Sequence, residues 1–376
     1  MDKMKVMTVV GTRPEIIKLS QIIKKLDDNF DHTLVHTGQN YDYELNEIFF
    51  EELGLRKPDI FLNAAGETSS QTIGNVIKKI ESPIVNFKPE AFVILGDTNS
   101  CMAAITAKRN KIPIFHLEAG NRCFDSRVPE EILRKIIDHT SDINLPYSDI
   151  AREYLLKEGI PPDRIIKIGS PMKEIINNYQ EKIRGSEILS KLNLNENCYF
   201  LISAHREENV DNKSKLIKFL DILNSLVEKY NLPIIVSTHP RTRNKIEIEN
   251  IKLNKNITLS KPFGYFDYIF LQLKAFCVIS DSGTITEESS ILNFPAINLR
   301  EVHEKPEGSE EMPVLMTGLS KTRIIQAISL IKNNFYGQAN KIKLVKDYSI
   351  ENVSEKVVRI ILSYKDYVKR EVWKDY

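Results

Sequence analysis

The sequence lacks the short motifs that define several large classes of nucleotide-using and hydrolytic enzymes. It has no GxxxxGK[ST] loop for a nucleoside triphosphate, no GxGxxG after its first apolar run for a dinucleotide, and no GxSxG elbow for a nucleophilic serine. These absences remove support for kinase and hydride-transfer chemistry. We therefore expect a protein that uses no cofactor.

Cysteines are few and far apart. They form no CxxC pair, and no histidine stands at zinc-ligand spacing from any of the four, which are Cys101, Cys123, Cys198 and Cys277. The sequence therefore predicts neither a disulfide framework nor a metal site. Four reduced thiols are typical of a cytoplasmic protein, which is the location that we expect.

The chain also lacks an excess of one charge and any long apolar run. Its 52 lysines and arginines balance 51 acids, so it has no general field for attracting nucleic acid or an acidic membrane. No stretch approaches the ~18 apolar residues that span a bilayer. The opening MDKMKVMTVVGTRP is only briefly apolar and leads into Arg13 and Glu15, and we interpret it as a first strand rather than a signal peptide.

A chain of 376 residues exceeds the size at which one hydrophobic core usually stops growing, so we expect two domains. Short β-branched runs, each followed by a helical pattern, predict parallel βαβ units. They fall in two groups, at 5–10, 33–36, 91–95, 112–116, 143–145 and 165–168, and then at 199–203, 232–237, 257–259, 277–280 and 296–299. The sequence therefore predicts two doubly wound, Rossmann-like α/β lobes.

Glycine and proline interrupt the pattern between these two groups. We place a hinge near Gly169, which gives a first lobe of residues 1–168 and a second lobe of residues 169–353, and we expect the lobes to close when a ligand binds. Residues 354–376 contain apolar side chains at helical spacing. We expect them to form a helix that packs back on the first lobe.

Polar residues follow most of the predicted strands, at the positions where open α/β sheets bind their ligands. We expect the strand ends of both lobes to face a common cleft. After the first strand, Arg13 and Lys18 stand at a helix N-terminus. Two explanations compete for them: they bind a phosphate or the substrate, or their charged ends simply lie in solvent.

A second candidate for anion binding lies in the other lobe. Ser282 and Gly283 connect a strand to a helix whose free N–H groups suit a diphosphate, although an ordinary N-cap explains the same residues. Glu287 and Glu288 follow one turn later, where one of them is within reach of a ribose hydroxyl, or both serve as acids favoured near a helix start.

Three carboxylates in the first lobe are candidates for proton transfer. Asp97 and Glu118 follow strands, and Glu130 begins a helix. Removing and returning a carbon-bound proton needs an acid and a base, which carboxylates in different environments supply. Helix capping is the alternative for Asp97 and Glu130. For Glu118, in a largely apolar run, burial without a function is the harder explanation.

Histidines also stand at predicted strand ends. His205 precedes Arg206, and its imidazole is suited to hold a diphosphate or to assist a leaving group. His116 and His239 occupy comparable positions. Each is equally well explained as a hydrogen-bonded turn histidine.

Taken in order, seven segments resemble the non-hydrolysing UDP-N-acetylglucosamine 2-epimerases. The resemblance runs from Lys5 to about Glu307, and together the segments are highly specific. They are GTRPEIIK, GDTNS, HLEAGNR, PEE with Arg134 close behind, AHREEN, DSGTITEE and Arg300 followed by HEKPE.

The resemblance implies a two-lobed glycosyltransferase B-type fold and an inversion at C2 of a UDP-N-acetylhexosamine. UDP would be eliminated to leave a 2-acetamidoglycal and then added back, in the synthesis of surface polysaccharide precursors. The implied acid, base or cation-stabilising groups are Asp97, Glu118 and Glu130, with His205 as a further catalytic residue. The implied substrate-binding residues are Arg13, Lys18, Arg134, His239, Ser282, Gly283, Glu288 and Lys305. The resemblance also implies a homodimer and a uracil site near Lys261–Tyr265.

Some positions depart from the common family pattern. Lys305 replaces an arginine and cannot reproduce its bidentate contacts. The segments HTGQNYDY, EAGNRCFD and HREEN look like the branch that acts on UDP-2-acetamido-2,6-dideoxy-L-talose to give UDP-N-acetyl-L-fucosamine, so both substrates stay open. Allosteric activation by a second UDP-sugar also stays open, because Asn40 stands where a histidine is common.

Two other classes of function fit the same fold. A glycosyltransferase would share the diphosphate-binding features of the second lobe, and a non-catalytic UDP-sugar sensor would bind the same ligand. A glycosyltransferase has less reason to carry Asp97, Glu118 and Glu130, and a sensor would tolerate their loss, so their joint presence favours an epimerase.

Overall fold

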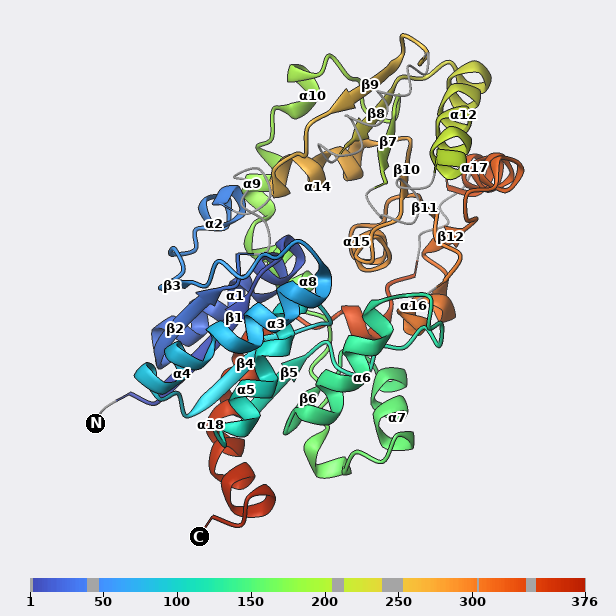
Figure 1. Cartoon of the computed structure of the whole chain (residues 1–376). Coiled ribbons are helices and arrows are strands. Elements are labelled where there is room, and N and C mark those ends of the chain that lie inside the picture. Colours follow the sequence, from blue (N-terminus) through green and yellow to red (C-terminus); the bar gives the residue numbers. More distant parts are fainter. Residues whose placement is uncertain are drawn as a thin grey trace. The chain divides into compact units, whose positions relative to one another are not determined.

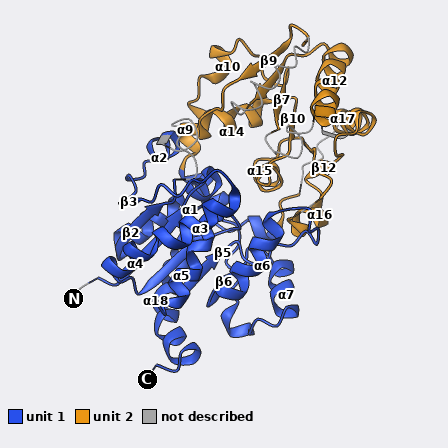
Figure 2. Ribbon diagram, viewed as in Figure 1, with its two compact units in different colours: residues 1–178, 346–376 blue, residues 179–345 orange. Residues whose placement is uncertain are grey.

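The computed structural model is a chain of helices alternating with parallel strands (Figure 1). It describes residues 3–38, 47–204, 213–238, 253–302, 304–335 and 343–375. The chain divides into two compact units, coloured separately in Figure 2. Unit 1 comprises Met1–Asn178 and Lys346–Tyr376, and unit 2 comprises Tyr179–Val345.

Unit 1 is built on a six-stranded parallel sheet in the order β3-β2-β1-β4-β5-β6. This is the doubly wound order, in which the chain changes direction across the sheet between β1 and β4. The strands are β1 Lys5–Val10, β2 Asp31–His36, β3 Ile60–Phe61, β4 Ala91–Leu95, β5 Ile114–Leu117 and β6 Ile143–Leu145.

Helices cover both faces of the unit 1 sheet, which explains why β4 is a continuous apolar run with every residue buried. One face packs against α3, α4, α5 and α6, and α1 packs with α8 and α18. The helices are α1 Arg13–Asn29, α2 Glu47–Glu52, α3 Ser69–Lys79, α4 Glu81–Phe87, α5 Ala103–Arg109, α6 Glu130–Thr140, α7 Asp149–Lys157, α8 Met172–Asn178 and α18 Val353–Val372.

Unit 2 repeats the same topology. Its six parallel strands run in the order β12-β11-β10-β7-β8-β9, so the change of direction falls between β7 and β10. The strands are β7 Phe200–Ser203, β8 Ile234–Ser237, β9 Ile257–Ser260, β10 Cys277–Ser280, β11 Ala296–Asn298 and β12 Val314–Met316.

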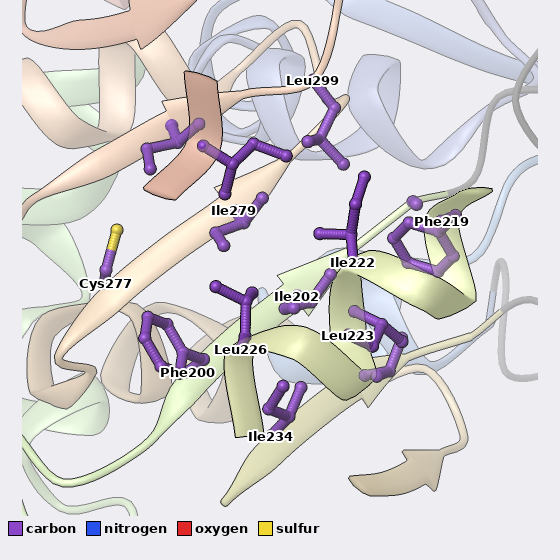
Figure 3. Close-up of a cluster of buried hydrophobic side chains, with 14 of the residues drawn as sticks. Phe200, Ile202, Phe219, Ile222, Leu223, Leu226, Ile234, Cys277, Ile279 and Leu299 are labelled. Atoms are coloured by element: carbon purple, nitrogen blue, oxygen red, sulfur yellow. The ribbon is translucent and has the colours of Figure 1, made fainter. Parts of the chain in front are cut away.

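Alternate residues of the unit 2 strands face opposite layers of helices. Phe200 and Ile202 pack with α12 and α17 in the cluster of Figure 3, whereas Leu201 packs on the other face with α14 and α15. The helices are α9 Gln180–Arg184, α10 Ile188–Lys191, α12 Lys213–Tyr230, α14 Tyr265–Lys274, α15 Ile285–Leu292, α16 Pro306–Glu311 and α17 Lys321–Phe335.

The predicted fold class is confirmed, with two doubly wound α/β units of the kind that make up the glycosyltransferase B-type fold. One predicted strand is wrong, because residues 165–168 form only an isolated bridge from Ile165 to Asn144 beside β6. Two edge strands, β3 and β12, were not predicted. In the described part of the chain, no helix is both long enough and apolar enough to cross a membrane.

The boundary between the units differs from the predicted one at residue 169. Gly169 lies inside unit 1, where a side chain at its position would approach Ile350 Cγ1 to 2.4 Å. The chain leaves unit 1 after Asn178 because α8 buries Met172 and Ile175 and packs on α1. The returning segment begins at Lys346, before the helix predicted from residue 354, and α18 packs on α1 within unit 1.

Candidate active site

The carboxyl ends of β1, β4 and β5 carry three of the predicted site residues of unit 1. These strands flank or adjoin the place where the sheet changes direction, which is where doubly wound sheets bind their ligands. Arg13 is the first residue of α1 after β1, Asp97 follows β4 through Gly96, and Glu118 directly follows β5. The topology therefore gathers at one sheet edge residues that are far apart in sequence.

Asp97 is held by Arg134 of α6. Arg134 Nε donates to Asp97 Oδ2 at 2.6 Å, and Arg134 Nη1 donates to Glu131 Oε2 at 3.0 Å. Arg134 is buried, whereas the Asp97 side chain is about a quarter exposed, at 26%. The guanidinium thus orients a carboxylate that still reaches solvent, which suits a group that acts on a ligand.

Glu118 is paired with Lys18 of α1. Lys18 Nζ donates to Glu118 Oε2, and both side chains are nearly buried. The backbone of Glu118 has φ +61°, a left-handed conformation that is rare and costly outside glycine. A strained backbone and a buried ion pair together fix this carboxylate at the end of β5.

Glu130 and Glu131 are consecutive, but their surroundings differ. Glu130 is half-buried, and its Oε2 is a buried atom with no hydrogen-bond partner in the part of the chain that the structure describes. Glu131 is buried and accepts from the N–H groups of Cys123 and Phe124, each at 3.1 Å. Burial disfavours the charged form of Glu131, but the Cys123 and Arg134 contacts outweigh burial and lower its pKa. Glu131 is therefore held by protein contacts through both of its oxygens, whereas the catalytic role of Glu130 stays a prediction.

Glu15 joins two of the turns and was not predicted as a site residue. Its carboxylate accepts from the N–H groups of Gly11 at 2.9 Å and Thr12 at 2.7 Å, and from the hydroxyl of Thr98 at 2.8 Å. Burial raises the pKa of Glu15 against these hydrogen bonds. The sequence signal was present, since Thr12 and Glu15 have the spacing of a capping box.

Arg13 lies beside an aromatic ring. Its guanidinium carbon is 5.8 Å from the centre of the Phe49 ring, within the range of a cation–π contact. Its position at the start of α1 places a fixed positive charge where the helix dipole also favours anions.

In unit 2, β10 leads through Asp281, Ser282 and Gly283 into α15. Ser282 N–H donates to Ser280 Oγ at 3.0 Å, and the hydroxyls of Ser282 and Thr284 lie 3.0 Å apart. This geometry is compatible with an N-cap and with an anion site alike, so the diphosphate role of these residues stays a prediction.

Two acidic residues of α15 have buried partners. Glu288 Oε2 accepts from Gln272 Nε2 at 2.7 Å, and Glu287 Oε2 accepts from Lys305 Nζ. Lys305 is thus tied to a buried carboxylate within unit 2, where the sequence alone had assigned it only to substrate. The ribose contact of Glu288 stays a prediction.

Some predicted residues lie outside the described part of the chain. His205 and His239 are among them, as are Arg206, Asn40 and His303. Of the predicted uracil segment, Tyr265 is the first residue of α14 and is buried. The roles of these residues rest on the sequence alone.

Comparison with known proteins agrees with this arrangement. A family model described as UDP-N-acetylglucosamine 2-epimerase matches residues 24–362, and the chain belongs to this family. It is 35% identical to the UDP-N-acetylglucosamine 2-epimerase of Methanocaldococcus jannaschii, over 97% of this chain and 100% of the other. The protein is therefore an isomerase of the epimerase type.

Solved structures give the same result. The structure of UDP-N-acetylglucosamine 2-epimerase from Rickettsia bellii superposes with a TM-score of 0.92 at 49% identity, over 99% of both chains. A crystal structure of the Methanocaldococcus jannaschii UDP-GlcNAc 2-epimerase in complex with UDP-GlcNAc and UDP superposes with a TM-score of 0.88 at 34% identity, over 96% of this chain and 100% of the other.

Proposed function

We propose that this enzyme inverts C2 of UDP-GlcNAc to give UDP-ManNAc, without hydrolysing the nucleotide. The observation that carries the proposal is the pair of carboxylates at neighbouring strand ends, Asp97 on Arg134 and Glu118 on Lys18. A protein that only binds a sugar needs no such ion-paired acids. An enzyme that removes and returns a carbon-bound proton needs an acid and a base.

The proposed reaction has two balanced steps. A carboxylate takes the proton from C2 while the bond from C1 to the diphosphate oxygen breaks, which gives 2-acetamidoglycal and UDP. A second group returns a proton to the other face of C2, and the diphosphate oxygen attacks C1 again. Asp97, Glu118 and Glu130 are the groups that we assign to acid, base and stabilisation of the cationic sugar.

We assign the nucleotide to unit 2. Ser282 and Gly283 lie at the start of α15, where the helix dipole favours a diphosphate. Glu288, oriented by Gln272, is assigned to the ribose. Arg13, His205, His239 and Lys305 are assigned to the diphosphate and the substrate on the basis of their motif positions.

Proton NMR of the purified protein with UDP-GlcNAc in D2O tests the proposal, with neither NAD nor metal added. Deuterium at C2 together with UDP-ManNAc would support both the substrate and the mechanism. No exchange with UDP-GlcNAc, but exchange with UDP-2-acetamido-2,6-dideoxy-L-talose, would assign the second substrate. No exchange with either would favour the glycosyltransferase or sensor classes.

We also propose a homodimer and a role in making surface polysaccharide precursors, as the family resemblance implies. Size-exclusion chromatography with light scattering tests the first, since a monomer mass of 43.2 kDa at working concentration would contradict it. Deletion of the encoding gene tests the second, with loss of surface polysaccharide as the expected result.

A further inference from the structure

A buried network lies directly behind the Asp97 and Glu118 turns. It centres on Asp138 of α6, whose side chain is 1% exposed. Of its members, the sequence had pointed only to His116, as a histidine at a strand end, and the proposed mechanism gives none of them a proton to move. The question is what a buried carboxylate does at this position.

Asp138 holds the turn that follows Glu118. The N–H of Gly120 lies 3.2 Å from each carboxylate oxygen of Asp138, and Arg122 Nη1 donates to Oδ2 at 2.7 Å. Gly120 has φ +81°, and a side chain there would meet the Ala151 carbonyl at 2.4 Å. The turn is therefore sharp and tightly packed, and Asp138 accepts a hydrogen bond from the backbone N–H of Gly120.

His116 of β5 connects the same carboxylate to the neighbouring turn. Its Nδ1 is 3.0 Å from Asp138 Oδ1, and its Nε2 is 2.8 Å from the carbonyl oxygen of Gly96. A carbonyl only accepts hydrogen bonds, so Nε2 carries the proton in this contact. Gly96, with φ +77°, is the residue immediately before Asp97.

Arg122 completes the network from the other side. Its Nε and Nη2 donate to the two oxygens of Glu158 at 2.7 and 2.6 Å, and its side chain is fully buried. Burial disfavours the charged form of Asp138, but His116 and Arg122 outweigh burial and lower its pKa. Asp138 therefore accepts hydrogen bonds from Gly120 and Arg122 and lies beside the imidazole of His116.

We propose that Asp138 and His116 are positioning residues that set the spacing between the carboxylates of Asp97 and Glu118. The buried carboxylate of Asp138 fixes both turns. It binds the Glu118 turn directly through the N–H of Gly120, and it reaches the Asp97 turn through the imidazole of His116 and the carbonyl of Gly96. The arrangement follows the same logic as a carboxylate that orients a histidine in a hydrolase, but here the histidine orients a backbone turn. The inference rests on the proposed epimerase function for its catalytic consequence.

The chain offers two matched controls at the other end of the same sheet. Asp142 is a buried carboxylate that accepts from Ile114 N–H at the start of β5 and from Lys108. His32, at the start of β2, pairs with Asp27 through Nδ1 and with Thr8 Oγ1 through Nε2. Asp142 binds the start of β5 and His32 lies at the start of β2, whereas Asp97 and Glu118 follow the ends of β4 and β5.

The experiment compares Asp138→Asn and His116→Gln with Asp142→Asn and His32→Gln. We expect the first two to lower kcat by about 100-fold, since a misplacement of 1 Å can have that effect. Their KM and their UDP affinity should change less than threefold. The controls should lower the melting temperature to a similar extent but leave kcat within threefold of the wild type.

Hydrogen exchange gives a second measurement that needs no substrate. In Asp138→Asn, exchange should accelerate in residues 95–98 and 117–122 together, whereas in Asp142→Asn it should accelerate around residues 112–114. A kcat that falls equally in the controls, or turns that keep their wild-type exchange in Asp138→Asn, would overturn the inference. If the wild type fails to exchange the C2 proton, the proposed function is wrong, and the exchange pattern alone decides whether Asp138 positions both turns.

Discussion

Lys18 and Glu118 form a buried ion pair across 100 residues of sequence, between α1 and the turn after β5. Lys18 also lies 5.8 Å from the centre of the Tyr147 ring, so the ammonium is enclosed on two sides. A buried pair of this kind is costly to break, because removal of one charge leaves the other without compensation. The pair therefore holds the carboxylate of Glu118 in one place.

The first prediction concerns the two paired carboxylates. Asp97→Asn and Glu118→Gln should each lower turnover by ~100- to 10,000-fold, the range that an acid or base contributes, because neither amide can accept the C2 proton. UDP affinity should stay close to the wild type. Steady-state kinetics and calorimetric titration with UDP are the measurements. Unchanged turnover in both variants would remove these residues from the mechanism.

The second prediction separates two consecutive acids. Glu130→Gln should lower turnover with little change in stability, since the Glu130 carboxylate has no protein hydrogen bond to Oε2 among the described residues. Glu131→Gln should lower stability by about 1–3 kcal/mol, because its carboxylate accepts from Cys123, Phe124 and Arg134. Urea unfolding of both variants beside their kinetics gives the comparison. The reverse pattern would exchange their roles.

The third prediction concerns the buried pair of Glu287 and Lys305 in unit 2. Lys305→Met should destabilise the protein by about 3–5 kcal/mol, because it removes one partner of a buried ion pair. The double variant with Glu287→Gln should recover part of the loss. The exposed pair of Lys321 and Asp221 is the control, and Lys321→Met should change the unfolding free energy by about 1 kcal/mol or less. A loss in Lys305→Met no larger than in the control would contradict the prediction.

The fourth prediction is a loss of stability in acid. The folded protein holds the pKa of Asp138 low, and hydrogen bonds from Arg122 similarly lower the pKa of Glu158. A folded pKa below the unfolded value means that the unfolded chain binds more protons, so this stability is complete above about pH 4 and is lost as the pH falls through the folded pKa. Burial raises the pKa of Glu15, so the folded chain binds this proton more tightly than the unfolded chain does. Glu15 therefore contributes stability as the pH falls, which opposes the loss from Asp138 and Glu158.

Urea unfolding between pH 3 and 6 measures this dependence. The unfolding free energy should decline below about pH 4 in the wild type. Glu158→Gln should flatten the decline, because one of the depressed carboxylates is gone. An equally steep decline in the variant would show that other groups control the acid transition.

The sequence predicted the strands well where an apolar run was long and bounded by turns. The bounds of β1, β4, β6 and β10 match the predicted ranges. The missed strands, β3 and β12, are short edge strands that are only partly buried, whereas β6, which also has three residues and lies at an edge, is fully buried. Residues 165–168 have the composition of a strand, but only Ile165 forms a bridge.

The site was predictable where it depends on strand order and not where it depends on pairing. The doubly wound pattern predicts that Asp97 and Glu118 are neighbours, because parallel strands end at one edge. That Lys18 is the partner of Glu118 requires contacts across 100 residues, which no local pattern contains. Likewise, the choice between Glu130 and Glu131 depends on how α6 is rotated against the segment around Cys123.

The return of α18 to unit 1 affects the order in which the two units fold. Residues 179–345 form unit 2 without interruption, so they can fold as soon as they leave the ribosome. Unit 1 is different, because α1 packs on α18, Glu174 accepts from the N–H of Ser354 at 2.9 Å, and Glu90 accepts from Lys365 at 2.9 Å. The half that is synthesised first therefore completes its fold last, because the apolar faces of its helices stay incompletely covered until residues 346–376 have been synthesised.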